Sequence, residues 1–183
     1  MEKRIEYADD DISPISKLLK LRVPSLMIGL LLGIGLSFVT SNFEDVLEKN
    51  VAVSFFIPFI VYLADAVGTQ TQSIYARDLK TGNASFRKYL IKETLLGIML
   101  GLIFSMLTAP IILFWFKSKE LMLAVCLSLF GAIATSPIIA LTITEILQVE
   151  RTDPAVGAGP IATVIQDTIS VLIYGLIASA ILL

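Results

Sequence analysis

The sequence predicts an all-α, polytopic membrane domain with five transmembrane helices. Of the 183 residues, 56% are apolar, and the charged residues gather in short segments between long apolar runs. A soluble domain of this size could not cover so much apolar surface with so few charges. Each run also reaches the length of about 20 residues that a helix needs to span a bilayer. The predicted spans are Val23–Val39, Val51–Arg77, Thr94–Phe116, Leu121–Ile146 and Pro154–Leu182.

The distribution of Lys and Arg predicts the orientation of these spans across the membrane. Eleven of the fourteen Lys and Arg residues lie before the first span, at the end of the second span and in the loop that follows it, or between the fourth and fifth spans. The opposite side holds Lys49, Lys117 and Lys119. Because cytoplasmic loops carry the excess of Lys and Arg, we expect a cytoplasmic N-terminus and an external C-terminus. The expected location is the plasma membrane, as a multi-pass protein.

The composition excludes several chemistries. The chain has no His, which excludes His-ligated zinc and Ser-His-Asp catalysis. Its single Cys126 cannot form an intrachain disulfide. We expect no enzymatic activity and no nucleic-acid partner, and the partners that we expect are the lipid bilayer and cations.

We divide the chain into a cytoplasmic leader, residues 1–22, and a transmembrane domain, residues 23–183. In the leader, Ser13-Pro14 is typical of a helix start, and apolar residues then alternate with Lys as in a short amphipathic helix. Such a helix lies on the cytoplasmic leaflet or, in the sharper alternative, sits beneath a pore as a plug. The first and third spans contain Gly pairs at small-xxx-small spacing, Gly29/Gly33 and Gly97/Gly101, which predict close helix packing.

The second span carries a dense polar segment at membrane depth. Such side chains cannot face lipid without a large penalty. At helical spacing Asp65, Thr69 and Gln72 share one face, and Gly68 beside them is expected to bend the helix or to open backbone carbonyls toward a cavity. The residues that we expect to line a pore here are Pro58, Gly68, Thr69, Gln70 and Gln72.

The fourth and fifth spans also carry interruptions and acids. Ser136-Pro137 is expected to break the fourth span, and Glu145 near its cytoplasmic end is a candidate for lining a vestibule. In the fifth span, Gly159 and Pro160 are expected to interrupt the first turns and line the mouth of the pore. A polar stripe then follows at i, i+4, i+7 and i+11: Thr163, Asp167, Ser170 and Tyr174.

The acids embedded in the membrane predict a cation site. A charge at the centre of a membrane helix costs about 2.5–3.5 kcal/mol on insertion scales, and no Lys or Arg lies deep enough to neutralise Asp65 or Asp167. Oxygen ligands suit Mg²⁺, with Mn²⁺ or Ca²⁺ as alternatives, and a sparse site suits Mg²⁺, which retains several waters. A two-fold homodimer would bring two copies of Asp167 together. The expected metal ligands are Asp167, Asp65, Thr163 and Ser170.

Two motifs resemble a known family. Pro58 followed by Gly68, Gln70 and Ala76-Arg77, together with DPAVGAGPIATVIQD…LIY in the fifth span, resembles the MgtE-type magnesium transporters. The resemblance implies a homodimer with an axial pore lined by the second and fifth helices, with Asp167 as the central magnesium-binding residue and the leader as a plug helix. Bacterial members usually show Gly-Gly-Asn where this chain has Ala64-Asp65-Ala66. They also carry a CBS-domain sensor before the membrane part, so we expect different regulation or a separate regulatory subunit.

Three alternatives remain open. The chain is a divalent-cation channel in the first reading, and in the nearest alternative a sodium- or proton-coupled carrier with Asp65 as the coupling site. An intramembrane aspartyl protease could use Asp65 and Asp167 as a dyad, although the usual sequence contexts of such enzymes are missing. A scaffold subunit without transport would leave the embedded acids unexplained.

Overall fold

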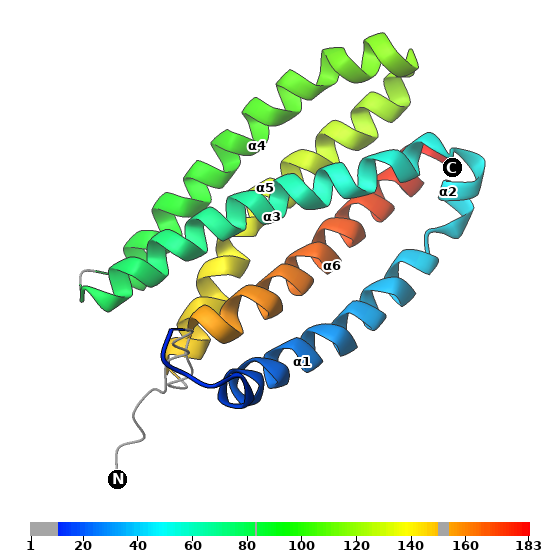
Figure 1. Ribbon diagram of the computed structural model, residues 1–183. Helices are drawn as coiled ribbons and strands as arrows, with labels where there is room; N and C mark the ends of the chain where they lie inside the picture. The colour runs from blue at the N-terminus through cyan, green and yellow to red at the C-terminus, as the bar shows by residue number, and fades with distance from the viewer. Residues whose placement is uncertain (1–10, 83, 150–153) are drawn as a thin grey trace.

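The computed structural model describes residues 11–82, 84–149 and 154–183. The side chains of residues 147–158 are not among those described. Within these residues the regular structure is helical throughout (Figure 1). All but the short second helix are long and apolar enough to cross a membrane, which confirms an all-α, multi-pass membrane protein with five spans. The helices are α1 (Ile15–Ser41), α2 (Glu44–Lys49), α3 (Ala52–Lys80), α4 (Phe86–Phe116), α5 (Lys119–Val149) and α6 (Pro154–Leu182).

The predicted leader helix and the first span form one helix, α1, with Pro24 inside it. Figure 1 shows the dark-blue first turns at an angle to the rest of α1. Proline lacks the N–H that would continue the helical ladder and its ring crowds the preceding turn, which accounts for a change of direction here. Residues 1–10 of the predicted leader lie outside the described residues.

Helix α5 is the centre of the protomer. It packs against α3, α4 and α6, whereas α1 packs mainly against α6 at the edge (Figure 1). Half of the α5 span is buried within the protomer, against 6% of the α1 span. Apolar side chains cover α1 on all sides and stay exposed, as expected of a helix that faces lipid or another protein chain.

The small residues of α4 allow its close approach to α5, as predicted. A Cβ atom added at Gly97 would lie 2.9 Å from Cγ of Pro137, and one added at Gly101 would lie 3.0 Å from the carbonyl oxygen of Phe130. The Ser105 hydroxyl also donates a 2.8 Å hydrogen bond to an α5 carbonyl. The contact is looser at the glycine pair of α1, where a Cβ at Gly29 would lie 3.9 Å from the carbonyl oxygen of Pro160 on α6 and one at Gly33 would meet no atom within 4 Å.

The predicted helix interruptions are wrong. Pro137 lies inside a continuous α5 and Pro160 inside a continuous α6. Membrane helices tolerate proline because neighbouring helices and local adjustments satisfy the backbone groups that it frees. The predicted pore mouth runs from Pro154 to Pro160, and the side chains of residues 154–158 lie outside the described ones.

Candidate functional site

Asp167 lies midway along α6 and is half-buried. Its Oδ1 atom is buried and has no hydrogen-bond partner among the described residues. A buried carboxylate oxygen without a donor is costly in a low-dielectric medium. The protomer therefore holds an embedded acidic side chain whose Oδ1 receives no hydrogen bond from the described residues.

The polar residues of α3 gather beside this part of α6. Asp65, Gly68, Thr69 and Gln72 line one small cavity together with Gln166 of α6 and residues of α5. The predicted shared face of α3 therefore meets the helix that carries Asp167. The cavity measures about 10 Å³, which is room for roughly one water molecule.

Gly68 has a packing role in this arrangement. A Cβ atom added at Gly68 would lie 2.5 Å from Oγ of Ser136 on α5. The Ser136 hydroxyl donates a hydrogen bond to the carbonyl oxygen of Ala64, one turn earlier on α3. Gly68 thus lets α5 approach α3 at the level of the cavity.

The residues of the predicted polar stripe on α6 do not all have the same surroundings. Gln166 donates from Nε2 to the carbonyl oxygen of Ala132, at 3.3 Å, and to Oγ of Ser170, at 3.1 Å, inside the protomer. The Tyr174 hydroxyl donates a 2.8 Å hydrogen bond to the carbonyl oxygen of Val53 on α3. Ser170 and Tyr174 are both buried, so they join α6 to its neighbours, whereas Asp167 keeps an unpartnered oxygen.

A second polar network joins α3 to α4 and α5 at the predicted cytoplasmic end. The Thr71 hydroxyl donates a 2.8 Å hydrogen bond to Glu93 of α4. The Tyr75 hydroxyl donates to the Glu145 carboxylate of α5, and the Tyr89 hydroxyl of α4 donates to Asp78. Glu145 is thus bound to a neighbouring helix, a role that its position near the span's end did not predict.

The other candidate residues occupy the helix surfaces. Pro58, Thr69 and Gln70 are exposed on α3. Thr163 is half-buried on α6, one turn before Asp167, and Gly159 and Pro160 are half-buried one turn earlier. Among the residues that the structure describes, no group of three or more His, Cys, Asp or Glu side chains could hold a metal ion.

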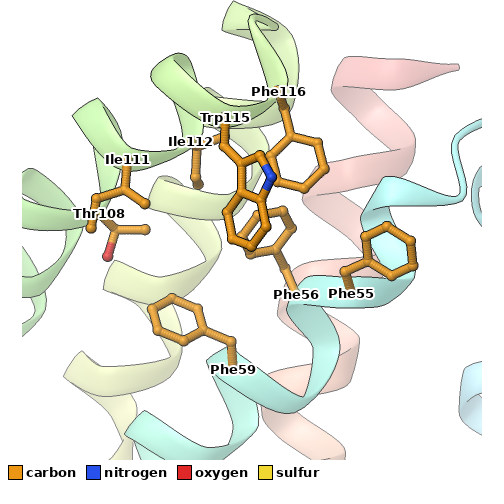
Figure 2. A pocket seen from close by; sticks show the side chains of 8 residues that line it. All are labelled: Phe55, Phe56, Phe59, Thr108, Ile111, Ile112, Trp115 and Phe116. Atoms are coloured by element: carbon orange, nitrogen blue, oxygen red, sulfur yellow. The ribbon is translucent and has the colours of Figure 1, made fainter.

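A larger cavity of about 480 Å³ lies at the other end of α3 and α4. Figure 2 shows Phe55 and Phe56 of α3 facing Trp115 and Phe116 of α4, with the Phe59 ring on the side of Thr108. Apart from one threonine its lining side chains are apolar, so it offers few ligands to a metal ion. Aromatic residues near the end of a span are typical of the membrane–water interface.

Sequence comparisons place this geometry in a family. Residues 57–177 match the MgtE family model, described as a divalent cation transporter, and this segment contains the α3 cluster, the α5 contacts and Asp167. Similar relatives are the magnesium transporters MgtE of Bacillus subtilis, with 30% identity over 87% of this chain, and of Thermus thermophilus, with 27% identity over 84%.

The chain spans 36% of the length of the Bacillus subtilis relative and 34% of the Thermus thermophilus one. A third relative, the magnesium transporter MgtE of Enterococcus faecalis, is 26% identical over 95% of this chain and 38% of its own length. The family match covers most of the membrane-spanning helices, so the resemblance in the α3 and α6 motifs is confirmed. This chain belongs to the MgtE family of divalent cation transporters.

Proposed function

We propose that this chain forms the ion-conducting membrane domain of a magnesium transporter, in which two copies face each other across a two-fold axis. The observation that carries the proposal is the half-buried Asp167 on a membrane-spanning helix, whose carboxylate forms no hydrogen bond or ion pair with the described residues. Two copies of Asp167 would place a charge of −2 beside one divalent ion. The family description and the names of the three relatives support a divalent cation, and Mg²⁺ in particular.

Several features of the protomer support the pairing. The spans found among the described residues are five, an odd number that does not divide into two equal repeats. Among the described residues of one protomer, no three His, Cys, Asp or Glu side chains lie together as a metal site. The outer surface of α1 remains apolar, and its Gly33 has no close neighbour. A second copy would supply the missing carboxylate and cover part of this surface.

In the proposed path, α3 and α6 present oxygen ligands along one groove. Mg²⁺ gives up its water reluctantly and is bound by one or two carboxylates with several waters retained. The paired Asp167 carboxylates would bind the hydrated ion directly or through water. Thr163, one turn away on α6, and Thr69 and Gln72 of α3 would accept or donate hydrogen bonds to the retained waters. Ser170 would act indirectly, because it is already bonded to Gln166.

The test is Mg²⁺ flux into proteoliposomes, followed with an internal Mg²⁺-sensitive dye. Asp167→Asn keeps the shape of the side chain and removes its charge, and we expect the flux to fall at least tenfold. The matched control is Thr168→Val, because the Thr168 hydroxyl bonds to the carbonyl oxygen of Val164 on its own helix. Wild-type flux in Asp167→Asn would refute the proposal.

The same assay separates a channel from a coupled carrier. In a channel, a membrane potential alone drives Mg²⁺ entry, and the rate does not depend on a sodium or proton gradient. A carrier requires one of these gradients. The aspartyl protease hypothesis gains no support, because the family consists of transporters.

A further inference from the structure

The aromatic cavity between α3 and α4 is open on the side that faces the bilayer. Its volume is about 480 Å³, and rings from both helices bound it (Figure 2). Of its lining side chains, Phe55 is 59% exposed and Trp115 is 74% exposed, whereas Ile112 is 1% exposed. Because α3 and α4 are long and apolar enough to span a membrane, these exposed rings face lipid. A lipid molecule therefore has direct access to the cavity.

The cavity exists because α3 and α4 do not pack closely on each other at this end. Both helices pack against α5, but they touch each other in few places. Here they meet through large rings, and the ring centroid of Phe116 lies 5.3 Å from that of Phe56 and 6.5 Å from that of Phe55. Protein interiors rarely keep a void larger than a water molecule. We therefore expect a ligand to fill the space.

The lining and the size of the cavity select an alkyl chain. Apart from Thr108 the lining side chains are apolar, so a metal ion or a polar solute finds few ligands there. A methylene group takes up about the volume of a water molecule in the liquid, about 30 Å³, so the cavity has room for roughly fifteen of them, or one lipid acyl chain. Because the tails of all membrane lipids are similarly apolar, the headgroup must decide which lipid binds.

Two lysines follow the aromatic rings directly in the chain. Lys117 and Lys119 come after Trp115 and Phe116, where α4 ends and α5 begins, and both are exposed. Among the described residues neither lysine forms an ion pair. Lys117 adopts the left-handed conformation, with a φ of 54°, at a helix end where glycine is the usual residue. Positive charge is thus placed next to the cavity, at the level of the lipid headgroups.

One acidic residue lies beside the two lysines in the chain. The carboxylate of Glu120 accepts a 3.1 Å hydrogen bond from the Ser118 hydroxyl. Two lysines and one glutamate leave residues 117–120 with a net charge of +1. Glu44 and Glu48 of α2 line a different groove, between α1 and α2. The charge next to the aromatic cavity therefore complements an anionic headgroup.

We propose that this cavity binds one acyl chain of an anionic phospholipid, whose phosphate group is held by Lys117 and Lys119. The bound chain fills the space between the rings and fixes the spacing of α3 and α4 at this end. The site shares no lining residue with the polar cavity between α3, α5 and α6, and it does not depend on the dimer proposed above.

The fluorescence of Trp115 tests the proposal, because this residue is the only tryptophan of the chain and lines the cavity. Lipids with brominated acyl chains quench tryptophan fluorescence on contact. The purified protein is reconstituted in phosphatidylcholine bilayers with rising fractions of brominated phosphatidylglycerol, which is anionic, or brominated phosphatidylcholine, which is zwitterionic. We expect half-maximal quenching at a mole fraction of phosphatidylglycerol about fivefold lower, the selectivity that one lysine near the surface gives to an anionic lipid.

A double lysine variant locates the headgroup. Changing Lys117→Gln and Lys119→Gln together should remove the preference for phosphatidylglycerol. The matched control changes Lys88→Gln and Lys92→Gln, which are exposed near the other end of α4, and should keep the preference. Because both double variants alter exposed side chains only, they test the proposal without disturbing the fold.

A second pair of variants locates the acyl chain. Thr108→Phe places a ring in the cavity and should also remove the preference, because the ring occupies the space of the chain. Leu107→Phe, at an exposed position outside the lining, should keep it. Asp167→Asn should keep the preference as well, which separates this proposal from the proposed function.

Three results would overturn the site. Equal quenching by the two lipids in the wild type would mean that Trp115 meets only unselective surrounding lipid. A preference that survives in the double variant of Lys117 and Lys119 would place the anionic lipid elsewhere. Quenching by neither lipid would show that another protein segment, such as a second copy of the chain, covers the cavity.

Discussion

The packing of Gly68 against Ser136 makes a double-mutant test that reports on the geometry of the site. Gly68→Ala adds a methyl group whose carbon would lie 2.5 Å from Oγ of Ser136. Overpacking of this kind costs about 1–3 kcal/mol. Alanine is the better helix former by about 1 kcal/mol. The net effect of Gly68→Ala alone is therefore a loss of up to about 2 kcal/mol.

Ser136→Ala removes the clashing atom. The next atoms that the new methyl carbon would meet are the carbonyl oxygen of residue 136, at 3.7 Å, and Cβ of Ala140, at 3.8 Å, which are ordinary contacts. Ser136→Ala alone loses the hydrogen bond to Ala64, worth about 0.6 kcal/mol on average between membrane helices. In the Ser136→Ala background, Gly68→Ala should therefore be neutral or stabilising.

The assay is reversible unfolding of the four proteins in mixed micelles, analysed as a cycle. We expect a coupling energy of about 1–3 kcal/mol, which equals the overpacking cost, because the helix-propensity gain cancels in the cycle. If Gly68→Ala has the same effect in both backgrounds, Ser136 is not the neighbour that excludes a side chain at residue 68. That result would support a bend at Gly68 and refute the close approach of α3 and α5.

Two further predictions concern packing on either side of the site. Tyr75→Phe removes the hydroxyl that donates to the Glu145 carboxylate and should lower the free energy of unfolding by about 1.5–3 kcal/mol. The control is Tyr62→Phe at an exposed position, which should change the free energy of unfolding little. Equal losses in the two variants would show that the hydrogen bond is not formed. Gly101→Leu should prevent α4 from packing on α5, because even a Cβ there would lie 3.0 Å from the α5 backbone. Gly35→Leu should be tolerated, because a Cβ at Gly35 would meet no atom within 4 Å. The yields of folded protein in size-exclusion chromatography compare the two variants, and equal yields would contradict the packing.

The fold could be predicted from the sequence because the signals for membrane-spanning helices are local. Long apolar runs fix the number and approximate place of the membrane helices, and helical spacing placed Asp65, Thr69 and Gln72 on one face. The breaks predicted at Pro137 and Pro160 failed because a proline signal is also local. Whether a helix continues through it depends on the helices packed around it.

The details of the site depended on packing that no local pattern encodes. Gln166 was overlooked because its importance follows from Ala132, which lies 34 residues away in the sequence and fixes the direction of the amide. Ser170 and Tyr174 share with Gln166 the spacing i, i+4, i+8, a face that turns into the protomer. The predicted stripe of Thr163, Asp167, Ser170 and Tyr174 therefore combined residues from two different faces of α6. The hydrogen bond from the Tyr75 hydroxyl to Glu145 likewise joins residues that are 70 positions apart in the sequence.

The central claim is that Asp167 completes its site with the Asp167 of a second copy. The most direct measurement is an experimental structure of the protein in lipid with Mg²⁺ present. We predict a two-fold dimer with an ion on the axis, between the two Asp167 carboxylates and flanked by α3 and α6. A structure in which Asp167 faces lipid, or in which the two carboxylates are far apart with no ion between them, would contradict the account.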